Sequence, residues 1–220
     1  MARWDSALEK VERSQSTNMI RLSLPSSLAM KWLIPALQNA SAINLKISLD
    51  VKEETVDLNA KESDAAIRFG PGPYPTLHST HLTHCWIQPV VSSKHHRVQD
   101  DHLLLFNDSK TPFLGDRRGE VDKTDFSWSY YFSKTSSVND DFNSDYQFDR
   151  ADLMLQAAIS GIGIGLGRTL LIEKDIEAGY LKAIGVSIRM RSSYWLVCSP
   201  SFAETNRFKK LRDWLKSEIP

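Results

Sequence analysis

The sequence predicts an α/β protein built from two lobes, and three observations lead to this class. Residues 19–70 alternate in the order strand, helix, strand, helix, strand, which is typical of a mostly parallel sheet. A second helix and strand unit occupies 150–168. The chain enters the second half near residue 83 and returns near residue 191, so two crossover strands and a cleft between the lobes are expected.

The first lobe is expected to begin with an apolar strand at 19–24, which ends at Pro25. Ser26 or Ser27 can cap the following helix. Pro35 lies inside that helical pattern, so it should kink or restart the helix. The other elements of this lobe are predicted at 43–50 (strand), 54–64 (short helix) and 65–70 (strand).

The second lobe is less clearly patterned, and residues 107–145 in particular are polar, with one aromatic cluster at 126–132. A final amphipathic helix is expected at 201–219, with its apolar residues on one side. The other predicted elements are strands at 84–92, 102–108, 146–148 and 193–200, a helix at 150–160, and a helix with a short strand at 171–184.

Four glycines alternate with apolar residues in "GIGIGLGR", residues 161–168. The spacing is not the G-x-G-x-x-G of a dinucleotide-binding turn, and the helix precedes the strand instead of following it. Gly161 fits the left-handed residue that ends a helix. One face of the strand then carries Ile162, Ile164 and Leu166, while the glycine face permits close packing of a neighbouring element.

Composition excludes several function classes. The 220 residues include 27 Lys and Arg against 27 Asp and Glu, with no long basic run, so the chain shows no nucleic-acid footprint of its own. It has no apolar run of eighteen residues and no signal-peptide pattern. Cys85 and Cys198 lie far apart in the sequence and are interpreted as reduced cytosolic thiols. Motifs of hydrolases, metalloproteases and P-loop enzymes do not occur, which argues against an enzyme.

Five segments in series resemble the effector-binding domain of LysR-type transcriptional regulators, and most closely the subgroup that includes the glycine-cleavage activator and the β-lactamase regulator. These segments are "SLAMKWLIPALQ", "DAAIRFGPGPYP", "FDRADLMLQAAISGIGIGLGRTLL", "AGYLKAI" and "SYWLVCSP". The similarity spans about residues 19–216. It implies a two-lobed, type II periplasmic-binding-protein-like fold, in which two α/β subdomains are joined by two crossover strands.

The resemblance also implies an organisation and a function. Subdomain I would comprise 19–82 and 192–220, subdomain II would comprise 83–191, and 1–18 would be the end of a linker helix. The expected function is to sense a small anionic or amino-acid-like effector in the cleft, in the cytoplasm and without a cofactor. The family's helix-turn-helix is absent here, so DNA would be contacted only through that part, by a homodimer that becomes a tetramer in the full-length protein. The alternative is a solute-binding module without a transcriptional role.

Candidate effector-binding residues follow from the family's cleft. Ser26 and Ser27 lie where a strand gives way to a helix, and they serve either as helix caps or as effector contacts, or as both. Arg68 ends the third strand beside Phe69, and its guanidinium can pair with an anion or form a structural salt bridge. Further candidates are Asn107 with Asp108 from the second lobe, Gly167 and Arg168 after the glycine strand, and Tyr194 or Trp195 on the return strand.

Two local features need separate interpretation. Arg150 and Ala151 depart from the Asp-Ser pair that is common in the subgroup, which changes the polar groups that the second lobe presents. His78, His81 and His84 recur every third residue next to Cys85, a composition that zinc sites favour. A three-residue step along a strand changes faces, however, so we predict no metal site there.

Overall fold

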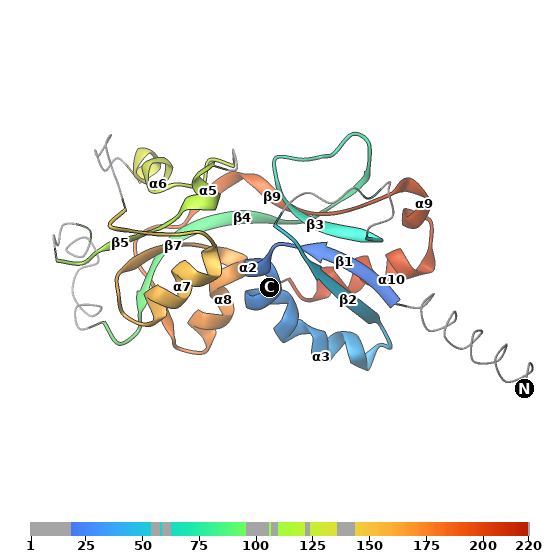
Figure 1. Ribbon diagram of the computed structural model, residues 1–220, viewed down its shortest axis with the longest axis horizontal. Helices are drawn as coiled ribbons and strands as arrows, with labels where there is room; N and C mark the ends of the chain where they lie inside the picture. Colours follow the sequence, from blue (N-terminus) through green and yellow to red (C-terminus); the bar gives the residue numbers. More distant parts are fainter. Residues whose placement is uncertain are drawn as a thin grey trace, which may run out of the picture.

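The computed structural model describes residues 19–53, 58, 63–95, 106, 110–121, 124–135 and 144–219. The predicted linker helix at 1–18 lies outside these residues, as do most of the helix predicted at 54–64 and most of the strand predicted at 102–108. Two lobes lie side by side in Figure 1. One lobe contains β1 (Met19–Leu24), α2 (Ser26–Leu28), η1 (Ala29–Leu33), α3 (Ile34–Ala42), β2 (Lys46–Val51), β3 (Ala65–Gly70), α9 (Pro200–Ala203) and α10 (Asn206–Ser217).

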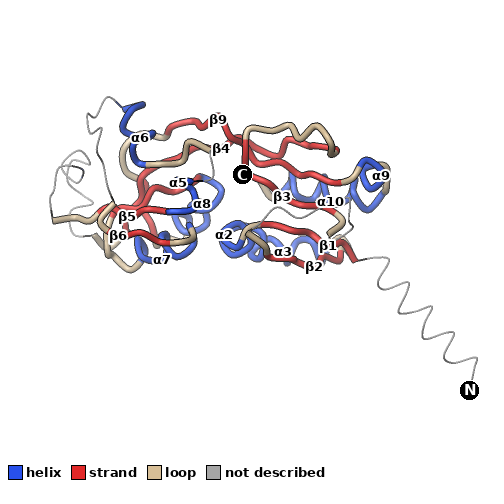
Figure 2. Tube along the Cα trace, turned by 45° about the horizontal axis from the view of Figure 1, so that its top comes forward, coloured by secondary structure: helices blue, strands red, loops and turns tan. Residues whose placement is uncertain are grey.

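The second lobe holds the remaining helices and shorter strands, and its α7 and α8 cover one side of its strands (Figure 2). Its elements are β5 (Phe113–Asp116), α5 (Arg117–Val121), α6 (Trp128–Thr135), β6 (Tyr146–Phe148), α7 (Ala151–Ile159), β7 (Ile164–Arg168), α8 (Thr169–Glu177) and β8 (Leu181–Ala183).

Two long strands, β4 (His78–Ser92) and β9 (Ile188–Cys198), run from one lobe into the other and pair with each other antiparallel. β9 also pairs with β3 in the first lobe, and β4 also pairs with β7 in the second. The sheet order is therefore β2-β1-β3-β9-β4-β7-β5-β6, with β8 beside β4. Within each lobe the short strands are parallel, as the sequence predicted for the first. We propose that the subdomain boundaries lie within these two strands, at 82/83 and 191/192.

The first helix changes its type where proline interrupts its hydrogen bonding. The pattern is α over residues 26–28, π over 29–33 and α again from Ile34. Pro35 has no amide hydrogen to donate, and its ring crowds the carbonyl of Lys31 four residues earlier. A wider turn just before the proline accommodates this conflict, and the α pattern begins again at Ile34, which agrees with the restart that the sequence predicted as an alternative to a kink.

Helix α7 ends as predicted at Gly161, whose φ of 80° is left-handed. Strand β7 lies between β4 and β5, so it is an inner strand of the sheet. A Cβ at Gly165 would lie 2.6 Å from the sulfur of Met154 in α7. The glycine face of β7 therefore serves the close approach of the helix.

One sequence-based prediction was wrong, and one stretch contains elements that the sequence did not predict. The final helix is divided into α9 and α10, because the Thr205 side chain accepts a hydrogen bond from the Phe208 amide and starts a new helix. Residues 107–145 contain β5, α5 and α6, which the polar composition concealed. The aromatic cluster of that stretch is part of the core: Trp128, Tyr131 and Phe132 are buried in one cluster with Ile20 and Leu22 of the first lobe.

Candidate functional site

A cavity of about 290 Å³ lies between the lobes. Its wall includes the ends of β1 and β3 from the first lobe, the end of β5 and the end of β7 from the second. These are the carboxyl ends of parallel strands, where open α/β sheets bind their ligands. β9 contributes Tyr194, and α8 contributes Leu171.

Charge is unevenly distributed around the cavity. Among the described residues, five cationic side chains line it against two carboxylates. The cations are Lys52, Arg68, Arg118, Arg150 and Arg168, and the carboxylates are Glu53 and Asp116. The excess of positive charge favours an anionic ligand.

The second-lobe side of the cavity contains a buried ion pair. Arg168 Nη1 lies 3.2 Å from Asp116 Oδ2, and these side chains are only 8% and 3% exposed. Asp116 Oδ1 accepts a hydrogen bond from the Gly119 amide, so the carboxylate also caps α5. The guanidinium of Arg168 lies over the ring of Phe126, 3.8 Å from its centroid, and 5.1 Å from that of Phe69. Arg168 is thereby oriented by contacts from both lobes.

The first-lobe side carries a second arginine with aromatic neighbours. The guanidinium of Arg68 lies 5.7 Å from the ring centroid of Tyr74, and burial lowers its pKa from the ordinary value. Phe69 packs against Tyr194 with the ring centroids 5.0 Å apart. Arg68 thus adds a guanidinium, whose planar fork of donors matches a carboxylate or phosphate, to the first-lobe side of the cavity.

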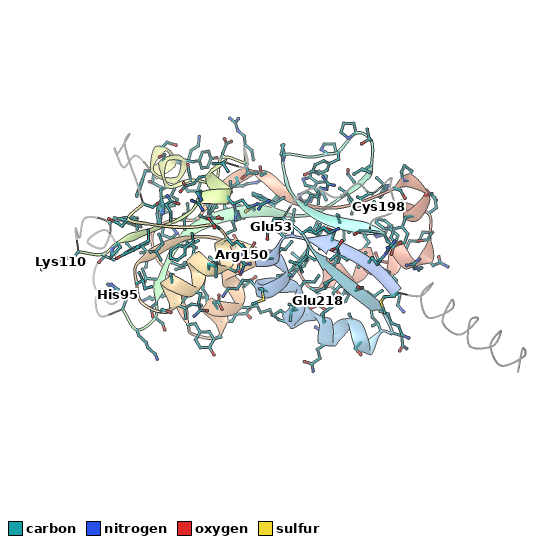
Figure 3. The ribbon with its side chains drawn as sticks, in the orientation of Figure 1. Glu53, His95, Lys110, Arg150, Cys198 and Glu218 are labelled. Atoms are coloured by element: carbon teal, nitrogen blue, oxygen red, sulfur yellow. The ribbon has the colours of Figure 1, made fainter. Side chains whose placement is uncertain are left out.

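Glu53 connects the two lobes at the edge of the cavity. Glu53 follows β2, and its Oε1 accepts a hydrogen bond of 2.8 Å from the Ser26 amide. Its Oε2 lies 3.5 Å from Arg118 Nε of α5, in the other lobe. Arg150 lines the same cavity and forms two hydrogen bonds with Asp152. Figure 3 labels Glu53 and Arg150, which both line the cavity where the lobes meet.

The cavity brings together most residues that the sequence singled out. Ser27, Arg68, Phe69, Arg168 and Tyr194 all line it, and so do Arg150 and Ala151. Whether they contact an effector remains a prediction.

The other candidates lie elsewhere or outside the described residues. Ser26 is buried, and its backbone amide donates a hydrogen bond to Glu53, which lines the cavity. The side chain of Trp195 donates a hydrogen bond from Nε1 to the carbonyl of Gly70. Gly167 is buried in β7, where a Cβ would lie 2.2 Å from Ile172 Cγ2. Asn107 and Asp108 lie outside the part of the chain that the structure describes.

Sequence reasoning missed Glu53, Asp116 and Arg118. Asp116 is the last residue of the short strand "FLGD", which begins directly after Pro112. A polar residue at the end of a short apolar segment after a proline was the signal that could have identified it. Glu53 and Arg118 lie in strongly charged surroundings of the sequence, where no single residue stands out.

The histidine segment differs from the simple alternation that the sequence predicted. The register between β4 and β9 shifts between His81 and Thr83, so a three-residue step on β4 spans only two on β9. The rings of His81 and His84 consequently lie 4.5 Å apart. Arg189 Nη2 lies 3.1 and 3.0 Å from the two ring nitrogens of His84. Among the described residues, no three His, Cys, Asp or Glu side chains are placed to hold a metal ion.

Both cysteines are buried free thiols on adjoining strands, Cys85 in β4 and Cys198 in β9. Burial raises the pKa of each thiol to about 12. In the described part of the chain, no helix is long and apolar enough to cross a membrane.

Comparison with known proteins agrees with this geometry. A family model described as the LysR substrate binding domain matches residues 13–220. The glycine cleavage system transcriptional activator of Escherichia coli K12 is 26% identical over 215 residues, which cover 95% of this chain and 68% of that protein. The HTH-type transcriptional regulator BlaA of Proteus vulgaris is 24% identical over 217 residues, covering 97% and 70%.

Solved structures show the same fold. The effector domain of the transcriptional regulator AmpR of Pseudomonas aeruginosa superposes with a TM-score of 0.70 at 20% identity, covering 91% of this chain and 94% of that one. The regulatory domain of CrgA, a LysR-type regulator from Neisseria meningitidis, gives a TM-score of 0.65 at 17% identity, covering 92% and 98%. The expected type II periplasmic-binding-protein-like architecture, with two subdomains and two crossover strands, is thus confirmed.

Proposed function

The chain belongs to the family of LysR substrate-binding domains, and on that premise we propose that its interlobe cavity binds a small anionic or amino-acid-like effector. The observation that carries the proposal is the cationic lining at the carboxyl ends of strands from both lobes. A ligand there contacts Arg68 and Ser27 on one side and Arg168 on the other. It therefore favours one arrangement of the lobes through its differential affinity for them.

We further propose that this change regulates transcription in the cytoplasm, through a homodimer that is a tetramer in a full-length regulator. The relatives are transcriptional regulators, which favours this role over a solute-binding module and over an enzyme. DNA would be contacted by the helix-turn-helix part that such regulators carry. Sedimentation analysis tests the assembly: a monomer at micromolar concentration would contradict the dimer.

The direct test is a thermal-shift screen with amino acids, small carboxylates, purines and muropeptide-like fragments. A ligand at a hundred times its dissociation constant adds about 2.7 kcal/mol to the free energy of unfolding. The shift should be lost in Ser27→Ala and in Arg68→Ala. A shift that both variants retain would place the ligand outside this cavity. Absence of any shift would contradict a small-molecule effector of these classes.

A further inference from the structure

The carboxylate of Glu53 lies at the cavity between donors that belong to the two lobes, a position that a ligand bridging the lobes would also occupy. It accepts a hydrogen bond from the Ser26 amide of its own lobe at 2.8 Å and contacts Arg118 Nε of the other lobe at 3.5 Å. Arg118 Nη2 also donates to the backbone carbonyl of Glu53. Each carboxylate oxygen thus faces a donor from a different lobe. Glu53 and Arg118 line the cavity, and so does Ser27, the residue that follows the Ser26 amide in the chain.

We propose that Glu53 is a built-in occupant of an anion position in the cavity, and that the effector carries a carboxylate that replaces it. This inference rests on the proposed function and specifies the ligand's chemistry. A free carboxylate offers the same two acceptor oxygens, so it can take the Ser26 amide and Arg118 in the same way. A neutral ligand cannot replace the ionic contact with Arg118.

Exchange of the two carboxylates is feasible because the internal one is weakly held. The side chain of Glu53 is 27% exposed and that of Arg118 is 44% exposed, and ion pairs at such exposure contribute little to stability. The remaining cations of the cavity, Arg68 and Arg150 among them, attract an incoming anion. Glu53 then lowers the apparent affinity of the domain for the effector, because the effector binds only those molecules in which Glu53 has left the anion position.

A second ion pair between the lobes provides a matched control. Lys31 of η1 lies 2.8 Å from Asp175 of α8, and each side chain is 15% exposed. This pair joins the same two lobes, but neither residue lines the cavity. Its removal weakens the contact between the lobes and leaves the anion position unchanged.

The experiment compares the wild-type domain with Glu53→Gln and Lys31→Gln. Glutamine keeps the size of the side chain and the backbone carbonyl that Arg118 contacts, while it removes the charge and replaces one of the two acceptor oxygens by an amide donor. The probes are acetate, glutarate and inorganic phosphate, with acetamide as the neutral match of acetate. Binding is followed by tryptophan fluorescence at pH 7.5 and constant ionic strength, after circular dichroism has established that all three proteins are folded.

We expect Glu53→Gln to lower the half-saturating concentration of acetate and glutarate about tenfold, as for a position that Glu53 fills about nine-tenths of the time. Lys31→Gln should match the wild type, and acetamide should not distinguish the proteins. If Glu53→Gln bound carboxylates no more tightly than the wild type, the inference would be overturned and the proposed function would stand. The same conclusion would follow if Glu53→Gln and Lys31→Gln gained affinity for carboxylates equally. A gain for phosphate alone would overturn the carboxylate assignment. If none of the three proteins bound any anion, the anionic effector itself would be contradicted.

Discussion

Arg168 and Asp116 form an ion pair in which neither side chain is more than 8% exposed, although the residues are 52 positions apart in the sequence. The pair ties β7 to β5 at the side of the cavity that the second lobe provides. Because Asp116 also caps α5, the same carboxylate positions Arg118, which reaches across to the first lobe.

Removing one partner of this pair should be strongly destabilising. Asp116→Ala removes the carboxylate that pairs with the buried guanidinium of Arg168, and we expect a loss of about 3–5 kcal/mol in the free energy of unfolding, measured with urea. Arg212→Ala serves as the control, since Arg212 lies 2.7 Å from the exposed Asp213 and should cost less than about 1 kcal/mol. Similar losses in both variants would show that Arg168 does not depend on Asp116.

The interpretation of Gly167 can be tested separately from ligand binding. A Cβ at this position would lie 2.2 Å from Ile172 Cγ2, so Gly167→Ala should overpack the contact between β7 and α8 and cost about 1–3 kcal/mol. In Gly70→Ala the nearest atom is the hydroxyl of Tyr74 at 2.8 Å, the end of a flexible side chain. Urea unfolding should therefore show a smaller loss for Gly70→Ala, and the reverse order would refute this packing argument.

Stability should fall in mild acid because of His81. Burial, then the neighbouring His84, Lys216 and Arg189, lower its pKa below the ordinary value of about 6.5. A histidine with a lowered folded pKa contributes stability above the unfolded pKa, and this contribution is lost as the pH falls through the folded pKa. Urea unfolding between pH 7.5 and 5.5 should show a decline that is smaller in His81→Gln. An identical pH dependence in the two proteins would assign the decline to other groups.

The two thiols should be unreactive in the folded domain. Their high pKa leaves almost no thiolate at pH 8, and burial also blocks the reagent. We expect no reaction of native protein with Ellman's reagent within minutes, and reaction of both cysteines in denaturant. Rapid labelling of Cys85 or Cys198 without denaturant would mean that β4 and β9 separate readily.

Much of the architecture was predictable because its signals are local. Ser27, Arg68 and Arg168 each follow or end a strand with a clear apolar pattern, and the turn or strand end delivers them to the cavity. Asp116 was not predictable in this way, since β5 has only four residues in a polar stretch. Glu53 and Arg118 contact each other although they are 65 positions apart in the sequence. A local sequence pattern cannot predict such a contact.

The histidine segment shows a different limit. Strict alternation predicts opposite faces for His81 and His84, and a single register shift reverses that result. Such shifts depend on the partner strand as well as on the strand itself. The split between α9 and α10 has a local origin instead, because the Thr205 side chain accepts a hydrogen bond from the Phe208 amide and so starts a new helix.

The two strands that carry the chain between the lobes, β4 and β9, are paired with each other, so these two crossings form one two-stranded ribbon. Any rotation of one lobe against the other must bend or twist this single two-stranded ribbon. The two register shifts, between His81 and Thr83 and between His84 and Trp86, interrupt the ladder within it and reduce its bending stiffness there. We therefore expect the ribbon to bend most easily at these two shifts, whose residues are separate from the charged ones that line the cavity.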